Sequence, residues 1–186
     1  MIIINQHIPK TGSTSIKSLF PNSIRYGKNK LNEDISSHCE CISFTVIRNP
    51  IDRFISCIKQ FRSFSHYNVD EIFDICIESN FSYEELHLGL NWHYTEQSIS
   101  LHSLSIFHPY LNVFDSVKEP KAQHLIDFNN LNTELSSILR RGSILLPVKN
   151  KSKEYNIQLK ENQIKEFNRK YEQDLIFYKN FIKKRK

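Results

Sequence analysis

The chain alternates short, strongly apolar runs with stretches in which apolar residues recur every three or four positions. Two β-branched runs, residues 2–8 and 41–47, predict buried strands. A helical pattern follows each run, at residues 14–19 and again from Pro50, where Asn49 can cap the helix and proline suits its first turn. Strands that alternate with helices predict an α/β fold with a central, mainly parallel sheet.

The remaining pattern predicts further elements of both kinds. We expect a loop at residues 21–37, an irregular segment at 89–102, a third strand at 111–117 and a short extended run at 143–147. Helices are expected at residues 69–79, 82–88, 119–129, 131–140 and 158–182. Because there is no internal repeat and no Gly/Ser-rich linker, we expect a single domain over residues 1–186.

The loop after the first strand combines a lysine, a glycine and four hydroxyl residues. These residues are Lys10, Thr11, Gly12, Ser13, Thr14 and Ser15. Backbone N–H groups at a helix start, a flexible lysine and hydroxyl donors together favour a phosphate or sulfate ligand. In a Walker A loop the lysine follows the last glycine, whereas Lys10 precedes Gly12, so the segment is not a Walker A motif.

A second candidate anion-binding segment follows the strand at residues 41–47. Arg48 comes at the end of that strand and can fork onto a phosphate, and Ser56 lies two helical turns further on. Arg53 and Ser56 are three positions apart and share a helix face. In parallel α/β sheets, ligands bind beyond the carboxyl ends of the strands, which is where both segments begin.

Together the two segments resemble the donor-binding motifs of the sulfotransferases that use 3'-phosphoadenosine-5'-phosphosulfate (PAPS). The first is similar to the 5'-phosphosulfate loop and the second to the 3'-phosphate motif. The carbohydrate branch, which includes the heparan sulfate 2-O-type enzymes, is the most similar. Weaker similarities follow in the family's order at residues 92–98, 114–119, 146–152 and 171–178. In the first of these the chain departs from the family because Trp92 precedes His93 and no proline follows.

The resemblance implies a P-loop-like three-layer fold and transfer of a sulfuryl group to a hydroxyl, with a carbohydrate as the expected acceptor. It places Lys10 at the leaving oxygen and residues 11–15 around the 5' end of PAPS. It places Arg48 and Ser56 at the 3'-phosphate. It implies that Lys151 and Ser152 close over the nucleotide and that no metal is needed.

The general base is expected between the two donor motifs, where members of the family commonly use a histidine or a glutamate. His38 is the first candidate, because a neutral imidazole suits this role near neutral pH. The segment between the motifs also offers Glu33, Asp34 and Glu40. His93, which follows the second motif, is the second candidate. His7 is expected to be structural, and surface positions without ligand spacing are expected for His102, His108 and His124.

Charge and cysteine content limit the partners and the compartment. A net charge of +5 and a pI of about 9.0 suit anionic ligands, although part of the charge lies in the tail at residues 183–186. We expect a small-molecule or glycan hydroxyl acceptor and no nucleic acid. Cys39 and Cys41 are too close for an ordinary zinc pair. No signal segment or membrane span is recognisable, so we expect reduced thiols and a cytoplasmic protein.

Two alternatives to a sulfotransferase stay open. A P-loop-type nucleotide kinase would bind ATP with Mg²⁺, although neither a Walker A loop nor a metal-binding aspartate after a strand is evident. A non-catalytic module could keep only the binding site for a nucleotide such as 3'-phosphoadenosine-5'-phosphate (PAP). The chain is shorter than typical carbohydrate sulfotransferases, which is compatible with that second alternative.

Overall fold

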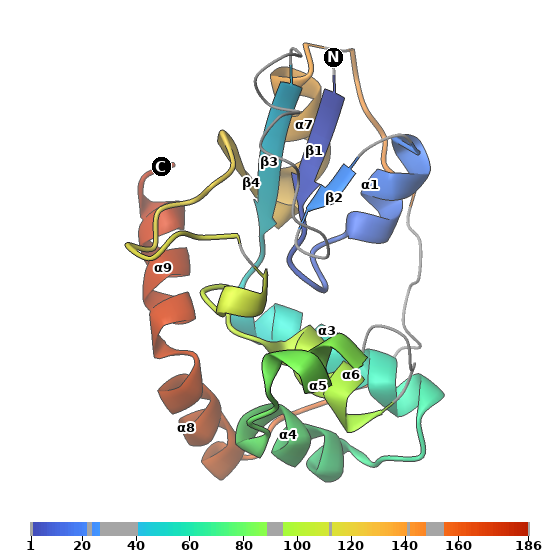
Figure 1. Cartoon of the computed structure of the whole chain (residues 1–186), viewed down its shortest axis with the longest axis vertical. Coiled ribbons are helices and arrows are strands. Elements are labelled where there is room, and N and C mark those ends of the chain that lie inside the picture. Colours follow the sequence, from blue (N-terminus) through green and yellow to red (C-terminus); the bar gives the residue numbers. More distant parts are fainter. Residues whose placement is uncertain are drawn as a thin grey trace. The chain divides into compact units, whose positions relative to one another are not determined.

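A computed structural model describes residues 2–21, 24–26, 41–88, 95–111, 113–140, 142–147 and 155–185. Internal contacts divide the chain into two units (Figure 1). The first unit is formed by Met1–Arg48 and Ile106–Lys151, and the second by Asn49–Ser105 and Ser152–Lys186. The second unit therefore contains both a segment inserted between two strands of the first and the C-terminal segment.

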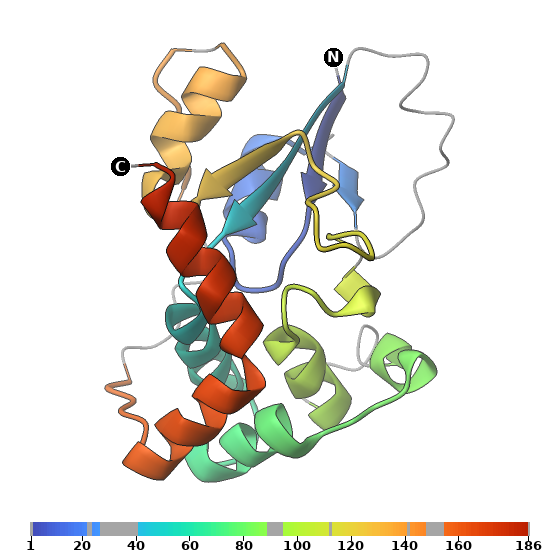
Figure 2. The same ribbon diagram turned by 90° about the vertical axis from the view of Figure 1, so that its left-hand side faces the viewer.

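In the described residues, the first unit is built on an open sheet of four parallel strands. The strands are β1 (Ile2–Gln6), β2 (Ile24–Tyr26), β3 (Cys41–Ile47) and β4 (His124–Asp127). They lie in the order β2-β1-β3-β4, and all three pairings are parallel. Figure 2 shows β3 and β4 side by side and pointing the same way. This sheet confirms the prediction of an α/β fold with a mainly parallel sheet.

The strand order places a reversal between β1 and β3. From β1 the chain goes to β2 on one side of the sheet, and then to β3 and β4 on the other. The segments that leave β1 and β3 therefore diverge at the carboxyl edge of the sheet. In open α/β sheets this is the position at which ligands bind.

One face of the sheet carries the apolar core of the first unit. Val46 of β3 pairs with Ile126 of β4, and both pack with Phe44. Ile16 of α1 (Ser13–Leu19) and Leu135 of α7 (Leu131–Ile138) belong to the same buried cluster. Each of these side chains contributes about 1.5–3 kcal/mol by its burial, so a one-residue slip of a strand would be costly.

The other face of the sheet carries buried polar side chains beside the apolar Ile4 and Ile47. Thr45 donates a hydrogen bond to the Gln6 side chain at 3.5 Å, which links β3 to β1. The Ser43 hydroxyl accepts the backbone N–H of Gln123 at 3.0 Å, and the Ser43 N–H donates to the Gln123 side chain at the same distance. These bonds satisfy polar groups that burial would otherwise make costly.

The described helices of the second unit surround an aromatic core. They are α3 (Pro50–Phe64), α4 (Val69–Glu78), α5 (Tyr83–Leu88), α6 (Glu96–Ser103), α8 (Glu161–Lys170) and α9 (Glu172–Lys183). Phe54 of α3 contacts the rings of Phe73, Phe167 and Tyr171 at centroid distances of 5.7, 5.0 and 5.6 Å. Asn49 accepts the backbone N–H of Ile51 at 3.0 Å and so caps α3 as predicted.

Several predicted elements are wrong. The expected strand at residues 111–117 does not form in the described residues: Asp115 begins a turn, because its side chain accepts the N–H groups of Val117 and Glu119 at 3.0 and 2.8 Å. The expected helix at 119–129 instead contains β4, whose backbone pairs with β3. Helix α6 forms within the segment expected to be irregular, where Thr95 caps it by accepting the Ser98 N–H at 3.3 Å.

Two further predictions differ from the structure in the extent of an element. Strand β2 lies in the segment expected to be loop, and pairing with β1 holds it in the sheet. The single helix expected at residues 158–182 is divided at Tyr171, which ends α8 and begins α9 (Figure 2). The helices at residues 69–79, 82–88 and 131–140 are confirmed within two residues at each end, the usual uncertainty of a helix boundary.

Candidate functional site

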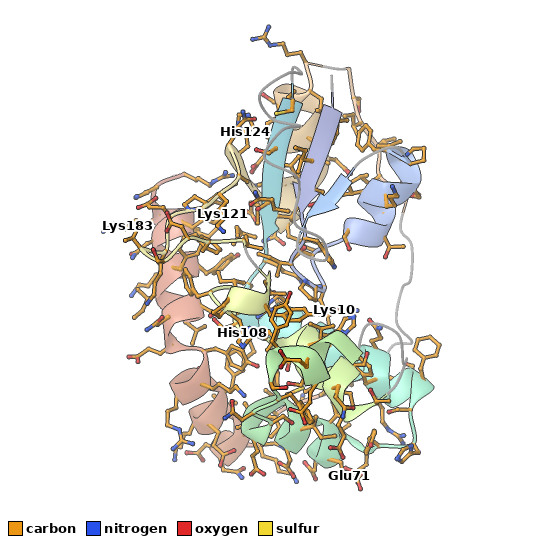
Figure 3. The ribbon with its side chains drawn as sticks, in the orientation of Figure 1. Lys10, Glu71, His108, Lys121, His124 and Lys183 are labelled. Atoms are coloured by element: carbon orange, nitrogen blue, oxygen red, sulfur yellow. The ribbon has the colours of Figure 1, made fainter. Side chains whose placement is uncertain are left out.

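The Lys10 loop is a tight turn between β1 and α1, beyond the carboxyl end of β1 (Figure 3). Lys10 and Gly12 both have left-handed backbones, with φ of 67° and 83°. The buried Thr11 hydroxyl donates to the Ile8 carbonyl at 2.7 Å and braces the turn. A non-glycine residue in this backbone region stores strain that the surrounding structure must hold.

Gly12 is required for space as well as for backbone conformation. A Cβ atom added to it would lie 3.3 Å from Cε2 of Phe128 and 3.4 Å from Cδ2 of Leu131. The loop therefore approaches the segment that follows β4 as closely as a glycine allows.

Arg48 is the first residue after β3, and its side chain reaches the Lys10 loop. Its Nη1 atom donates a hydrogen bond to the Lys10 carbonyl at 3.0 Å. Its guanidinium carbon lies 4.5 Å from the centroid of the Phe128 ring, within the range of a cation–π contact. The two segments singled out in the sequence thus meet at the carboxyl edge of the sheet.

Phe128 completes this group and was missed by sequence reasoning. It follows Asp127, the last residue of β4, and begins the 3₁₀ turn η2 (Phe128–Asn130). The Asp127 side chain accepts the backbone N–H of Asn129 at 3.0 Å and the side-chain N–H of Asn130 at 3.3 Å. An Asp-x-Asn sequence after two apolar residues is a turn signal that could have ended a strand here.

The other predicted donor-site residues are distributed over both units. In the loop, Ser13 is buried, Thr14 is exposed and Ser15 is half-buried. Ser56 is half-buried on α3 in the second unit, whereas Arg48 belongs to the first. The predictions for His38, His93, Lys151 and Ser152 lie outside the described residues, as do those for Glu33, Asp34 and Glu40.

His7, His102, His108 and His124 differ in their exposure. His7 is half-buried just after β1, and His124 is exposed at the first position of β4 (Figure 3). His108 accepts the backbone N–H of Tyr110 through Nδ1 at 3.2 Å. His102 is half-buried rather than on the surface, with Nδ1 2.7 Å from the Ser98 carbonyl and its ring 5.4 Å from Phe61.

Arg53 is held in a buried ion pair within the second unit. Its Nη2 lies 3.4 Å from Oδ2 of Asp174 on α9 and donates to the Leu104 carbonyl at 2.8 Å. Ser105 donates to Oδ1 of Asp174 at 2.5 Å. Arg53 and Asp174 expose only 3% and 1% of their side chains. Two segments that resemble the family separately, around Arg53 and at residues 171–178, are therefore joined by this pair.

Thiol and phenol groups beside this pair are buried. Among the described cysteines, Cys57 and Cys76 are buried and Cys41 of β3 is half-buried, and none of the three forms a disulfide. Burial, together with the neighbouring Cys57, raises the pKa of the Cys76 thiol well above its usual value. The Tyr171 hydroxyl donates to the Ser103 carbonyl at 2.7 Å, and burial strongly raises its pKa. Because both pKa values are raised, the Cys76 thiol and the Tyr171 phenol are neutral at pH 7.

No protein-family model matches the chain, and none of the curated proteins matches it. The resemblance to sulfotransferases is therefore one of short motifs and their order.

The described helices are too short or too polar to cross a bilayer. Within the described part of the chain, no three or more His, Cys, Asp or Glu side chains form a group that could hold a metal ion.

Proposed function

We propose that this protein is a sulfotransferase that moves a sulfuryl group from PAPS to a hydroxyl of a carbohydrate. The observation that carries the proposal is the contact between Arg48 and the Lys10 loop at the carboxyl edge of the sheet. A donor with phosphate groups on both its 5' and 3' sides requires two anion-binding segments that act together. The two segments with those motifs leave adjacent strands where the strand order reverses.

The residues of the first unit suit the two ends of such a donor. Lys10 supplies a cation in a turn with two left-handed residues, and backbone N–H groups in such turns can face an anion. Because the Thr11 hydroxyl already donates to Ile8, we propose that Thr11 contributes mainly its backbone N–H. Arg48 supplies a planar guanidinium, which pairs with phosphate better than a lysine ammonium does.

In the proposed reaction the acceptor hydroxyl attacks sulfur in line with the bond to the 5'-phosphate. A new O–S bond forms, the bond from sulfur to the bridging oxygen breaks, and that oxygen's electrons stay on the phosphate of PAP. Lys10 neutralises the charge that develops there. The resemblance further assigns removal of the acceptor proton to His38 or His93 and the 3'-phosphate to Arg48 and Ser56, and it implies that Lys151 and Ser152 close over the nucleotide.

The proposal extends to the fold: we propose that the parallel sheet of the first unit is the core of a P-loop-like three-layer fold. The order β2-β1-β3-β4 and the position of the Lys10 loop between β1 and α1 support this assignment. No step of the reaction calls for a metal ion.

Calorimetric titration of the whole chain with PAP, 5'-AMP and ATP–Mg²⁺ tests the proposal. PAP should bind at least about tenfold more tightly than 5'-AMP, because each charge-assisted hydrogen bond to the 3'-phosphate contributes roughly 1.5–3 kcal/mol. Tighter binding of ATP–Mg²⁺ than of PAP would instead favour a kinase. PAP binding without transfer from labelled PAPS to any hydroxyl of a glycan library would favour a non-catalytic module.

A further inference from the structure

We infer that Phe128 is a positioning residue for the anion site. Its ring contacts both Arg48 and the Lys10 loop and so fixes their positions relative to each other. The assignment of a ligand rests on the proposed function, whereas the packing role rests on geometry alone. Neither the anion-binding motifs nor the helical pattern expected at residues 119–129 pointed to this residue.

The sheet register brings Phe128 beside Arg48. Ile47 of β3 pairs with Asp127 of β4, so Arg48 and Phe128 are the first residues after two adjacent strands. The Asp127 side chain then bends the chain into η2 by accepting the Asn129 N–H at 3.0 Å. Strand pairing and this turn together fix where the ring lies.

The edge of the Phe128 ring contacts the Lys10 loop, and its face contacts Arg48. The edge at Cε2 and Cδ2 lies 3.3 and 3.9 Å from the position that a Cβ atom of Gly12 would take. The ring face receives the Arg48 guanidinium at 4.5 Å from the centroid. One half-buried side chain therefore contacts both the left-handed turn of the loop and the arginine.

The ring also limits the positions that the Arg48 guanidinium can take. A guanidinium binds a phosphate through the N–H groups in its plane and stacks on an aromatic ring through its face. The guanidinium carbon lies over the Phe128 ring at 4.5 Å from its centroid and Nη1 donates to the Lys10 carbonyl, so two contacts of different kinds hold the Arg48 side chain. A leucine would keep apolar contact with Gly12 but would not offer the electron-rich face that orients the cation.

Binding of PAP and 5'-AMP to Phe128→Leu and Phe128→Tyr, compared with the natural chain, tests the inference. Phe128→Leu should lower the affinity for PAP about tenfold and should lower the affinity for 5'-AMP much less, because only PAP carries the 3'-phosphate assigned to Arg48. Phe128→Tyr keeps the ring face and should restore the ratio of the two affinities. An equal loss for both nucleotides, or no loss, would show that Phe128 does not position Arg48.

A second measurement separates the packing role from the proposed function. Urea unfolding of Arg48→Gln, Phe128→Leu and the double variant measures the coupling of the two side chains without any ligand. We expect Arg48→Gln to lower the urea midpoint clearly less in the leucine background than in the natural chain. Additive shifts would overturn the inference even if PAP binds. A natural chain that binds no PAP but shows this coupling would overturn the proposed function and leave the packing role standing.

Discussion

Nη1 of Arg48 donates a hydrogen bond of 3.0 Å to the backbone carbonyl of Lys10, joining residues 38 positions apart. The arginine thus holds the main chain of the loop, while the Lys10 side chain extends from a backbone with a φ of 67°. The conformation of the loop and the position of the arginine are consequently linked. Substitutions can separate the role of the Lys10 side chain from that of its main chain, because truncation of the side chain leaves the carbonyl in place.

Lys10→Ala and Arg48→Ala should each weaken PAP binding by roughly 1.5–3 kcal/mol, the usual loss for one charge-assisted hydrogen bond. Arg48→Ala should also lower stability, since it removes the contacts with the Lys10 carbonyl and Phe128. Calorimetry and urea unfolding measure the two effects separately. Lys165→Ala on α8 is the matched control, because its partner Glu161 and its own side chain are both exposed. Unchanged PAP affinity in Lys10→Ala would refute the site.

Gly12→Ala should destabilise the protein by about 1–3 kcal/mol, because alanine is strained at a φ of 83° and its Cβ would press on Phe128. Gly142→Ala provides the control, since an added Cβ there meets nothing within 4 Å. It should be neutral or stabilise by up to about 1 kcal/mol by restricting the unfolded chain. Chemical denaturation of both variants measures the difference, and equal midpoints would contradict the close packing of the loop.

Arg53→Met should cost about 3–5 kcal/mol of unfolding free energy, because it leaves the buried Asp174 carboxylate without its cation. The double variant Arg53→Met/Asp174→Leu should cost less than the sum of the single substitutions, since it removes both charges. A cycle of urea unfolding measurements gives this coupling.

The exposed pair Glu161 and Lys165 is the control for that cycle. Its members lie four positions apart on α8 at 3.1 Å and are largely exposed. Their coupling should be no more than about 0.5 kcal/mol. A coupling between Arg53 and Asp174 as small as this would mean that the buried pair does not hold α3 and α9 together.

Alkaline pH should destabilise the protein through Tyr171. Burial raises the pKa of this phenol in the folded state above its ordinary value of 10.0. The stabilisation by the neutral phenol is therefore complete below about pH 10 and is lost as the pH rises further, at about 1.4 kcal/mol per pH unit. Cys76, whose pKa is also raised by burial, adds to the loss above its ordinary value of 9.0. Urea unfolding at several pH values between neutral and strongly alkaline measures the slope.

The variant Tyr171→Phe separates the ionisation of Tyr171 from other causes of lost stability at alkaline pH. The variant should be less stable by about 1–3 kcal/mol at neutral pH, because the buried Ser103 carbonyl loses its donor. Its stability should nevertheless fall less steeply above pH 10 than that of the natural chain. Parallel pH profiles for the two proteins would assign the alkaline loss to other groups. Tyr83→Phe, at a side chain with 64% exposure, should leave the profile unchanged.

Local sequence patterns predicted the elements whose residues carry their own signals. The β-branched run at Cys41–Ile47 is a buried strand, and Asn49 with Pro50 begins α3 as its capping chemistry requires. The same patterns placed Lys10 and Arg48 after parallel strands, and the contact between them follows from that placement. The short strand β4 was missed because its hydrogen bonds come from β3, far away in the sequence.

The sequence by itself therefore determined the class of fold, the main strands and helices, and the two basic segments suited to an anion. These depend on apolar spacing, β-branching and capping, which are properties of neighbouring residues. Only the tertiary structure decided that Arg53 pairs with Asp174, that Gly12 has no room for a side chain and that Phe128 lies under Arg48. Each of these contacts joins residues distant in the chain, and packing and strand register, rather than local propensity, determine where they meet.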